Sequence, residues 1–110
     1  HCPVCGGPME VNLRKDGYFV EDEAWHEAQS RYAHFIRGIG SGRIVLLELG
    51  VGFNTPGIIR FPFEQLTHQH HRATLIRVNR DNAKAMPENR NQTISFEEEM
   101  EVVVRDLRYN

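Results

Sequence analysis

Two cysteines near the start of the chain have the spacing of metal ligands. Cys2 and Cys5 are separated by two residues, and the two glycines that follow allow a tight turn that points backbone N–H groups at sulfur. A structural zinc site needs four ligands, and this chain offers one cysteine pair. The other ligands would come from an upstream pair, from histidines such as His1 or His26, or from a second chain. We expect half of a structural zinc site; the alternative is a pair of free thiols.

A second candidate site follows the most apolar segment of the chain, residues 43–49. Glycines after a strand let the backbone approach a phosphate closely, and the next helix N-terminus offers free N–H donors. Open α/β sheets bind ligands at this end of their strands. The third glycine of the dinucleotide fingerprint is absent, so an ordinary tight turn is the alternative. The candidate phosphate-binding residues are Gly50, Val51, Gly52, Asn54, Thr55 and Arg60.

A third candidate site follows the next apolar segment, residues 73–79, which ends in Asn79-Arg80-Asp81. A polar side chain at the carboxyl end of such a strand can bond ribose hydroxyls, as the acidic residue of dinucleotide folds does. We therefore expect Asn79 and Arg80 to bind a nucleotide. The alternative is a turn that merely ends the strand.

Other reactive residue types have structural explanations. His68, His70 and His71 fit the end of a surface helix better than a metal cluster. Trp25 and the other aromatic residues at helical spacing around it predict a core-facing side of a helix. We find no arrangement of serine, histidine and aspartate that predicts nucleophilic catalysis.

The elements that must position these residues are predicted from periodicity and capping. We expect a short strand at 18–20 after an Asp16-Gly17 turn, and a helix over 22–37 capped by Asp22. The apolar run 43–49 predicts a strand covered on both faces. A turn at 56–61, a helix over 62–69 and a strand over 73–79 would complete one βαβ unit. After a loop over 82–93, Ser95 and Glu98 predict a capping box that opens a last helix.

Composition sets the protein class. The chain has 110 residues, enough for one domain, and a net charge of −2 argues against a nucleic-acid partner. The longest apolar run, Ile44 to Leu47, is far below the ~18 residues of a membrane span, and we expect no signal peptide. Two cysteines at a metal spacing favour a reducing, cytoplasmic setting. The chain begins inside a motif and without Met, so we expect a fragment.

The chain resembles the C-terminal part of sirtuins in three stretches: Cys2–Pro8, Gly50–Gly52 and Ala73–Asn79. In that family, a zinc cysteine pair is followed by a substrate loop. A strand ending in Gly-Thr-Ser contacts the NAD phosphates, and a later strand ending in Ile-Asn contacts the adenosine ribose. Residues 50–64 are most similar to the microbial branch linked to macrodomain proteins, which is associated with ADP-ribosylation of a lipoyl-carrier protein.

The resemblance implies an α/β fold, namely a partial Rossmann-like parallel sheet with a remnant of a small zinc-binding subdomain. Residues 1–20 would be the remnant and the substrate loop, and residues 21–110 the C-terminal half of an NAD-binding domain. It implies NAD as the ADP-ribose donor, structural zinc, a protein acceptor such as a lipoyl-carrier protein, and a macrodomain protein as a partner. The parent would be a transferase or a deacylase.

The departures from the sirtuin pattern limit what carries over. Gly50-Val51-Gly52 replaces Gly-Thr-Ser, so a hydroxyl contact to phosphate is lost, and Asn54 or Thr55 would substitute for it. Arg14 falls where the substrate loop should begin, and we assign it a catalytic role there. The catalytic centre would lie before His1, so we expect the chain alone to be inactive.

Three further expectations concern assembly and alternative functions. The bare sheet edge predicts a homodimer. A non-catalytic zinc-ribbon interaction module is the first alternative function. A generic nucleotide-binding regulatory domain is the second.

Overall fold

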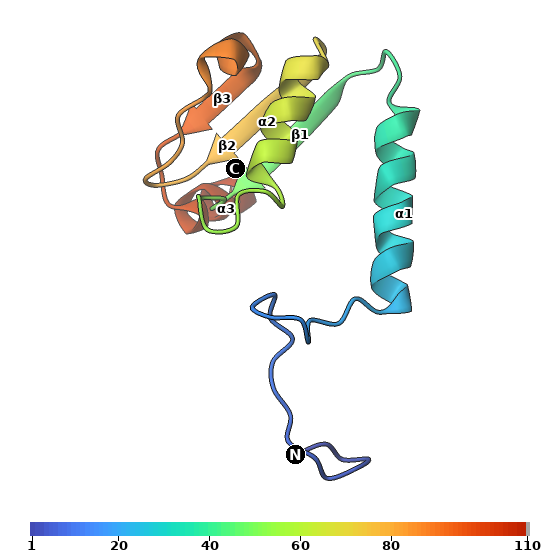
Figure 1. The fold of residues 1–110 in the computed structure, drawn as a ribbon. Helices are drawn as coiled ribbons and strands as arrows, with labels where there is room; N and C mark the ends of the chain where they lie inside the picture. Colours follow the sequence, from blue (N-terminus) through green and yellow to red (C-terminus); the bar gives the residue numbers. More distant parts are fainter. Residues whose placement is uncertain (110) are drawn as a thin grey trace. The chain divides into compact units, whose positions relative to one another are not determined.

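A computed structural model describes residues 1–109, which form two compact units, His1–Gly38 and Ile39–Asn110 (Figure 1). The first unit contains one regular element, helix α1 (Glu23–Gly38). The predicted domain boundary at residue 20 lies before this helix, whereas the boundary between the units follows it. The second unit contains β1 (Ile44–Leu49), α2 (Arg60–Gln69), β2 (Ala73–Val78), the 3-10 helix η1 (Pro87–Gln92), β3 (Thr93–Phe96) and α3 (Met100–Tyr109).

Helix α1 begins where its cap predicts. The Asp22 carboxylate accepts a hydrogen bond from the backbone N–H of Trp25 at 2.8 Å, which satisfies one of the free donors of the first turn. The predicted burial of the aromatic side is wrong, because no α1 residue is buried. Tyr32 and Phe35 are 51% and 61% exposed. Within the described residues of the first unit no other helix or strand is present to cover them.

The predicted strand at 18–20 is also wrong. Residues 14–18 form turns, and none of the described residues before α1 is in a strand. The side-chain amide of Asn12 donates to the carbonyl of Val20 and accepts from its N–H, both at 2.9 Å. One side chain therefore satisfies the backbone groups that a partner strand would have satisfied.

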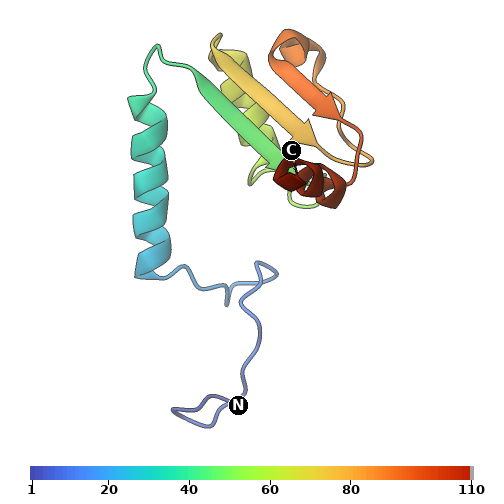
Figure 2. The same cartoon turned by 180° about the vertical axis from the view of Figure 1, so that it is seen from behind.

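The second unit is built on a parallel sheet in the order β1-β2-β3, which confirms the α/β prediction. Figures 1 and 2 show α2 across one face of the sheet and α3 beside the carboxyl ends of the strands. β1, α2 and β2 form the expected βαβ unit. Because the strands are parallel, the loops after β1 and β2 leave from the same edge of the sheet.

Only one face of the sheet is covered within this unit. Residues of β1 are alternately buried and exposed. Ile44 and Leu46 face the core, whereas Val45 and Leu47 are 62% and 53% exposed. The prediction that this strand is covered on both faces is therefore wrong for the described residues. A continuous apolar run usually indicates a strand that is buried on both faces of the sheet. Within the described residues of this unit, only the face beneath α2 has a covering layer (Figure 2).

Helix α2 begins two residues earlier than predicted. Pro62 is its third residue, a position where the missing N–H has no acceptor within the helix in any case. Its predicted end at Gln69 is confirmed, and His70 follows as the C-cap.

The predicted capping box at Ser95 and Glu98 is wrong. Ser95 lies in β3, pairs with Arg77 of β2, and donates its hydroxyl to the carbonyl of Ala83 at 2.7 Å. Helix α3 begins only at Met100. The segment Thr93–Phe96 combines β-branched and aromatic residues, and pairing with β2 outweighed its local helix-start signal.

Across residues 1–109, no helix combines the length and the apolar character that a membrane crossing requires.

Candidate functional site

The loops after β1 and β2 meet at the carboxyl end of the sheet, and we call residues 50–57 and 79–82 the carboxyl edge. Gly50 turns the chain out of β1 with φ of 66°, a conformation that residues with a side chain rarely adopt. Its N–H still donates to the carbonyl of Val78 in β2 at 2.8 Å. The sheet pairing and the left-handed glycine together fix where this loop begins.

Gly52 faces two side-chain amides from the second loop. A Cβ placed on Gly52 would lie 3.9 Å from Nδ2 of Asn79 and 3.9 Å from Nδ2 of Asn82. The orientation of the Asn79 amide is fixed, because its Oδ1 accepts the backbone N–H groups of Asp81 and Asn82 at 2.9 and 2.8 Å. Its Nδ2, a hydrogen-bond donor, is therefore the atom turned toward Gly52. A glycine beside two amide donors is suited to an anionic or hydroxyl-bearing ligand.

Asn82 was not among the residues predicted from sequence. The sequence did contain a pattern that indicates Asn82. It stands three residues after Asn79 at the end of a strand, and an asparagine side chain commonly closes a turn of this length by accepting a backbone N–H.

Arg60, predicted to bind phosphate, is used inside the protein. It is only 3% exposed, and its Nη1 donates to the carbonyls of Val51 at 3.1 Å and Asn82 at 3.0 Å. Its guanidinium lies 4.2 Å from the centre of the Phe53 ring. Burial lowers the pKa of Arg60, and the charge of Arg77 lowers it further, although nearby carboxylates oppose both effects. The described contacts of Arg60 join the two loops of the carboxyl edge.

Arg60 belongs to a buried ionic cluster, whose other members are Glu48, Glu64 and Arg77. Arg77 is fully buried and contacts Glu48 at 2.5 and 3.1 Å and Glu64 at 2.9 Å. Burial alone would lower the pKa of Arg77, but its hydrogen bonds to Glu48 and Glu64 and the negative charges of these two residues raise it overall. Arg77 also donates to the carbonyl of Lys84 at 3.0 Å. The cluster therefore holds the chain after β2 as well as the sheet.

Arg80, the other predicted basic contact, is exposed and engaged by carboxylates. It contacts Asp81 at 2.9 Å and Glu99 at 2.8 Å. The hydrogen bonds that Arg80 donates to Asp81 and then to Glu99 raise the pKa of Arg80, and the bond from Arg80 lowers the pKa of Asp81. A phosphate reaching Arg80 would compete with these two acids.

Asn54 and Thr55 lie at the exposed tip of the first loop. Thr55 has φ of 55°, which is uncommon for a residue with a branched side chain. The structure thus brings Gly50, Val51, Gly52 and Asn79 together at the carboxyl edge and places Asn54 and Thr55 on its solvent side.

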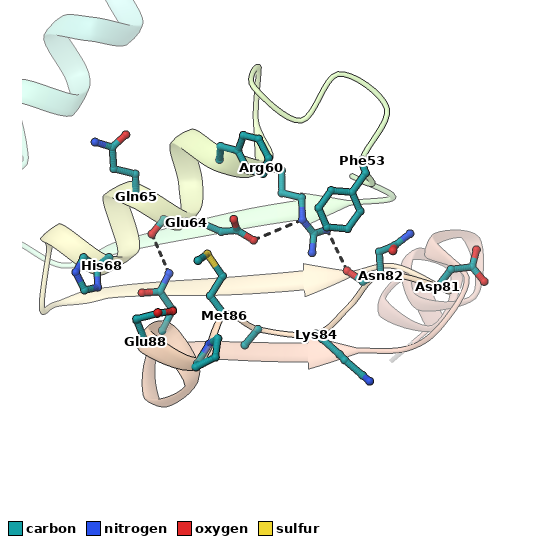
Figure 3. A pocket seen from close by; sticks show the side chains of 14 residues that line it. Phe53, Arg60, Glu64, Gln65, His68, Asp81, Asn82, Lys84, Met86 and Glu88 are labelled. Carbon is teal, nitrogen blue, oxygen red and sulfur yellow. Dashed lines mark hydrogen bonds and ion pairs between the residues drawn. The ribbon is translucent and has the colours of Figure 1, made fainter.

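A cavity of about 870 Å³ opens between α2 and residues 81–89, beside the carboxyl edge (Figure 3). Phe53, Asp81 and Asn82 belong to both the cavity wall and the edge, and Arg60, which bonds to both loops of the edge, also lines the cavity. The rest of the lining is largely apolar and includes Phe61 and Met86. Arg60 is therefore among the residues that line this cavity, although little of it is exposed to solvent.

The predicted metal and catalytic residues lie in the first unit. Cys2 and Cys5 are free thiols on a turn closed by hydrogen bonds from Cys2 N–H to Gly7 and from Gly6 N–H to Cys2, both 2.8 Å. Backbone N–H groups of Cys5 and Val4 lower the pKa of the Cys2 thiol, which favours the thiolate that metals bind.

Residues 1–109 contain no group of three or more histidine, cysteine or acidic side chains able to hold a metal ion. The cysteine pair therefore supplies at most two of the four ligands of a zinc site. Arg14, the predicted catalytic residue, contacts Glu21 at 2.6 Å and lies 4.2 Å from the centre of the Phe19 ring.

Fold and site together define a parallel α/β unit in which two loops meet at the carboxyl ends of the strands. The chain is similar to a Staphylococcus aureus (strain Mu50) protein named Protein ADP-ribosyltransferase, with 30% identity over 104 residues, which cover 94% of this chain and 33% of that protein. It is also similar to a Fusarium oxysporum f. sp. cubense protein named Probable bifunctional ADP-ribose hydrolase/ADP-ribosyltransferase, with 38% identity over 84 residues. That match covers 70% of this chain and 13% of the relative.

No family model matches the chain. The chain spans about a third of the first relative and a smaller share of the second. The names of both relatives include ADP-ribosyltransferase, and neither includes sirtuin. The similarity therefore supports the ADP-ribosyltransferase expectation more directly than the sirtuin one.

Proposed function

We propose that this chain forms the NAD-binding edge of a protein ADP-ribosyltransferase of sirtuin-like type. The observation that carries the proposal is the approach of Gly52 to the amides of Asn79 and Asn82 at the carboxyl ends of parallel strands. The names of the two relatives support the same reaction class. A deacylase activity has no comparable support.

The residues of the edge would bind and orient NAD. The backbone at Gly50 and Gly52 would approach the pyrophosphate, and Asn79 and Asn82 would donate to phosphate or ribose oxygens. Asn54 and Thr55 remain proposed contacts from the loop tip. In the transfer, the bond between nicotinamide and ribose breaks and the ribose carbon joins an acceptor side chain. Holding the ADP-ribose part still is this edge's contribution to that step.

Titration of the 110-residue chain with ADP-ribose, followed by amide signals in NMR, tests this proposal because it detects weak binding. We expect shifts concentrated at residues 50–55 and 79–82. Gly52→Ala should weaken binding by about tenfold, because its methyl group occupies the space beside the two amides.

Gly57→Ala is the matched control, since a Cβ there meets nothing within 4 Å. Shifts that map elsewhere, or a Gly52→Ala variant that binds like the parent chain, would rule out the proposed edge.

We also propose that Cys2 and Cys5 supply two thiolates to a structural zinc whose other ligands come from outside the described residues. The lowered pKa of Cys2 and the tight turn support this role. Cobalt(II) added to the 110-residue chain should give a thiolate charge-transfer band at about one metal per two chains. Cys2→Ser should abolish the band. One metal per single chain would instead favour a self-contained zinc module.

A protein acceptor, of which a lipoyl-carrier protein is one example, and a macrodomain partner complete the proposed setting. Arg14 remains the proposed catalytic contribution of the first unit. The cytoplasm remains the proposed compartment, and a homodimer through the sheet edge the proposed assembly.

A further inference from the structure

One nitrogen atom joins the two loops that form the carboxyl edge. Nη1 of Arg60 donates to the carbonyl of Val51, next to Gly52, and to the carbonyl of Asn82, whose amide faces Gly52. Figure 3 shows the Arg60 guanidinium beside the Phe53 ring, with a dashed line to Asn82. Beyond the sheet pairing at Gly50, this guanidinium therefore links the loop that carries the glycine to the loop that carries the amides.

The guanidinium is itself held from several sides. The Phe53 ring lies 4.2 Å from it, and a Glu64 carboxylate oxygen lies 3.5 Å from Nε. Glu64 is fixed in turn by Arg77, which pairs with Glu48 in the sheet. A side chain that is 97% buried and held in this way has little freedom to change its reach.

We infer that Arg60 is a positioning residue of the carboxyl edge, one that sets the distance between Gly52 and the amides of Asn79 and Asn82 rather than touching the nucleotide. This inference rests on the proposed function for the identity of the ligand. The geometry explains why an arginine close to a candidate anion site has its donors directed at backbone carbonyls. It also gives the buried ionic cluster a role in binding.

The cavity beside α2 makes a chemical test of this role feasible. Arg60 lines the cavity, so truncation to alanine leaves a space open to a small cation. In Arg60→Ala, guanidinium chloride at low concentration should refill that space. A role limited to general stability would not predict recovery of nucleotide affinity by this ion.

The experiment measures ADP-ribose affinity and the amide signals of Gly52 and Asn82 in the 110-residue chain. Arg60→Ala should weaken binding by about tenfold and shift both signals. Guanidinium chloride should restore both, whereas sodium chloride at the same concentration should not. Should Arg60→Ala fail to fold, Arg60→Lys, which keeps the charge but loses the planar fork, replaces it.

Arg72→Ala is the matched control, because Arg72 also donates to a backbone carbonyl, that of Ser41 at 3.0 Å, but lies just before β2 begins. We expect it to leave affinity within about twofold of the parent chain. Equal losses in the two variants, unchanged Gly52 and Asn82 signals in Arg60→Ala, or the absence of rescue would overturn the inference. If the parent chain does not bind ADP-ribose, the proposed function fails, while the two signals and their rescue still test the positioning role.

Discussion

At the scale of single residues, the two glycines of the first loop contribute differently. Gly50 is needed for its backbone conformation, whereas Gly52 has no positive φ and is needed for the space beside the amides. From the sequence we predicted the same role for both, since a glycine pair after a strand indicates close approach to a phosphate. The backbone φ of Gly50 and the amides beside Gly52 distinguish the two roles. Both are properties of the folded chain that the sequence alone does not show.

Gly50→Ala should therefore destabilise the chain through backbone strain, and not through a clash of its methyl group with neighbouring atoms. An alanine at φ of 66° is strained by about 1–2 kcal/mol, while its Cβ would meet the Met100 side chain at ordinary distances, 3.5 Å from Sδ and 3.9 Å from Cε. Urea unfolding should show this loss as a lower transition midpoint. Gly52→Ala should unfold at nearly the parent midpoint. If the two variants unfold alike, the distinction between the two glycines is wrong.

At the scale of elements, the strands with strong apolar patterns were predicted and the short third strand was not. Ile44–Leu49 and Ala73–Val78 were found to within a residue or so, because β-branched and apolar residues follow one another there. Thr93–Phe96 has four residues, and its pairing with β2 is a long-range contact that no local pattern records. The serine and the glutamate that suggested a helix cap are a weaker signal than this pairing.

The role of Ser95 distinguishes a strand from a helix cap. Ser95→Ala should cost about 1 kcal/mol, because the carbonyl of Ala83 loses its hydroxyl donor. Glu98→Ala should change stability by less than about 0.5 kcal/mol, because Glu98 lies between the strand and α3 and is exposed. Thermal unfolding of the two variants measures both effects. Equal losses would restore the capping box as the explanation.

At the scale of the whole second unit, the ionic cluster replaces part of an apolar core. Among the described residues of this unit, six buried residues are apolar and two of them are alanines: Ile44, Leu46, Ala73, Leu75, Val78 and Ala83. Glu48 and Arg77 are direct partners across β1 and β2, each fifth in its strand. Charged residues at matching positions of two apolar strands were a signal for this pair. The strand alignment needed to use it came only from the structure.

The cluster makes a definite prediction about how its members depend on one another. Arg77→Met should destabilise the chain by about 3–5 kcal/mol, because Glu48 then remains buried without its partner. Glu48→Gln should also destabilise it. The double variant should lose less than the sum of the two, since it removes both buried charges together.

Urea unfolding of the four chains gives the coupling energy directly. Losses that add within about 0.5 kcal/mol would mean that Glu48 and Arg77 act independently. A coupled loss would mean that the sheet beneath α2 and the chain after β2 are held by one interaction. The Arg77 bond to the carbonyl of Lys84 should then break in the single arginine variant, and residues 82–86 should exchange their amide hydrogens faster than in the parent chain.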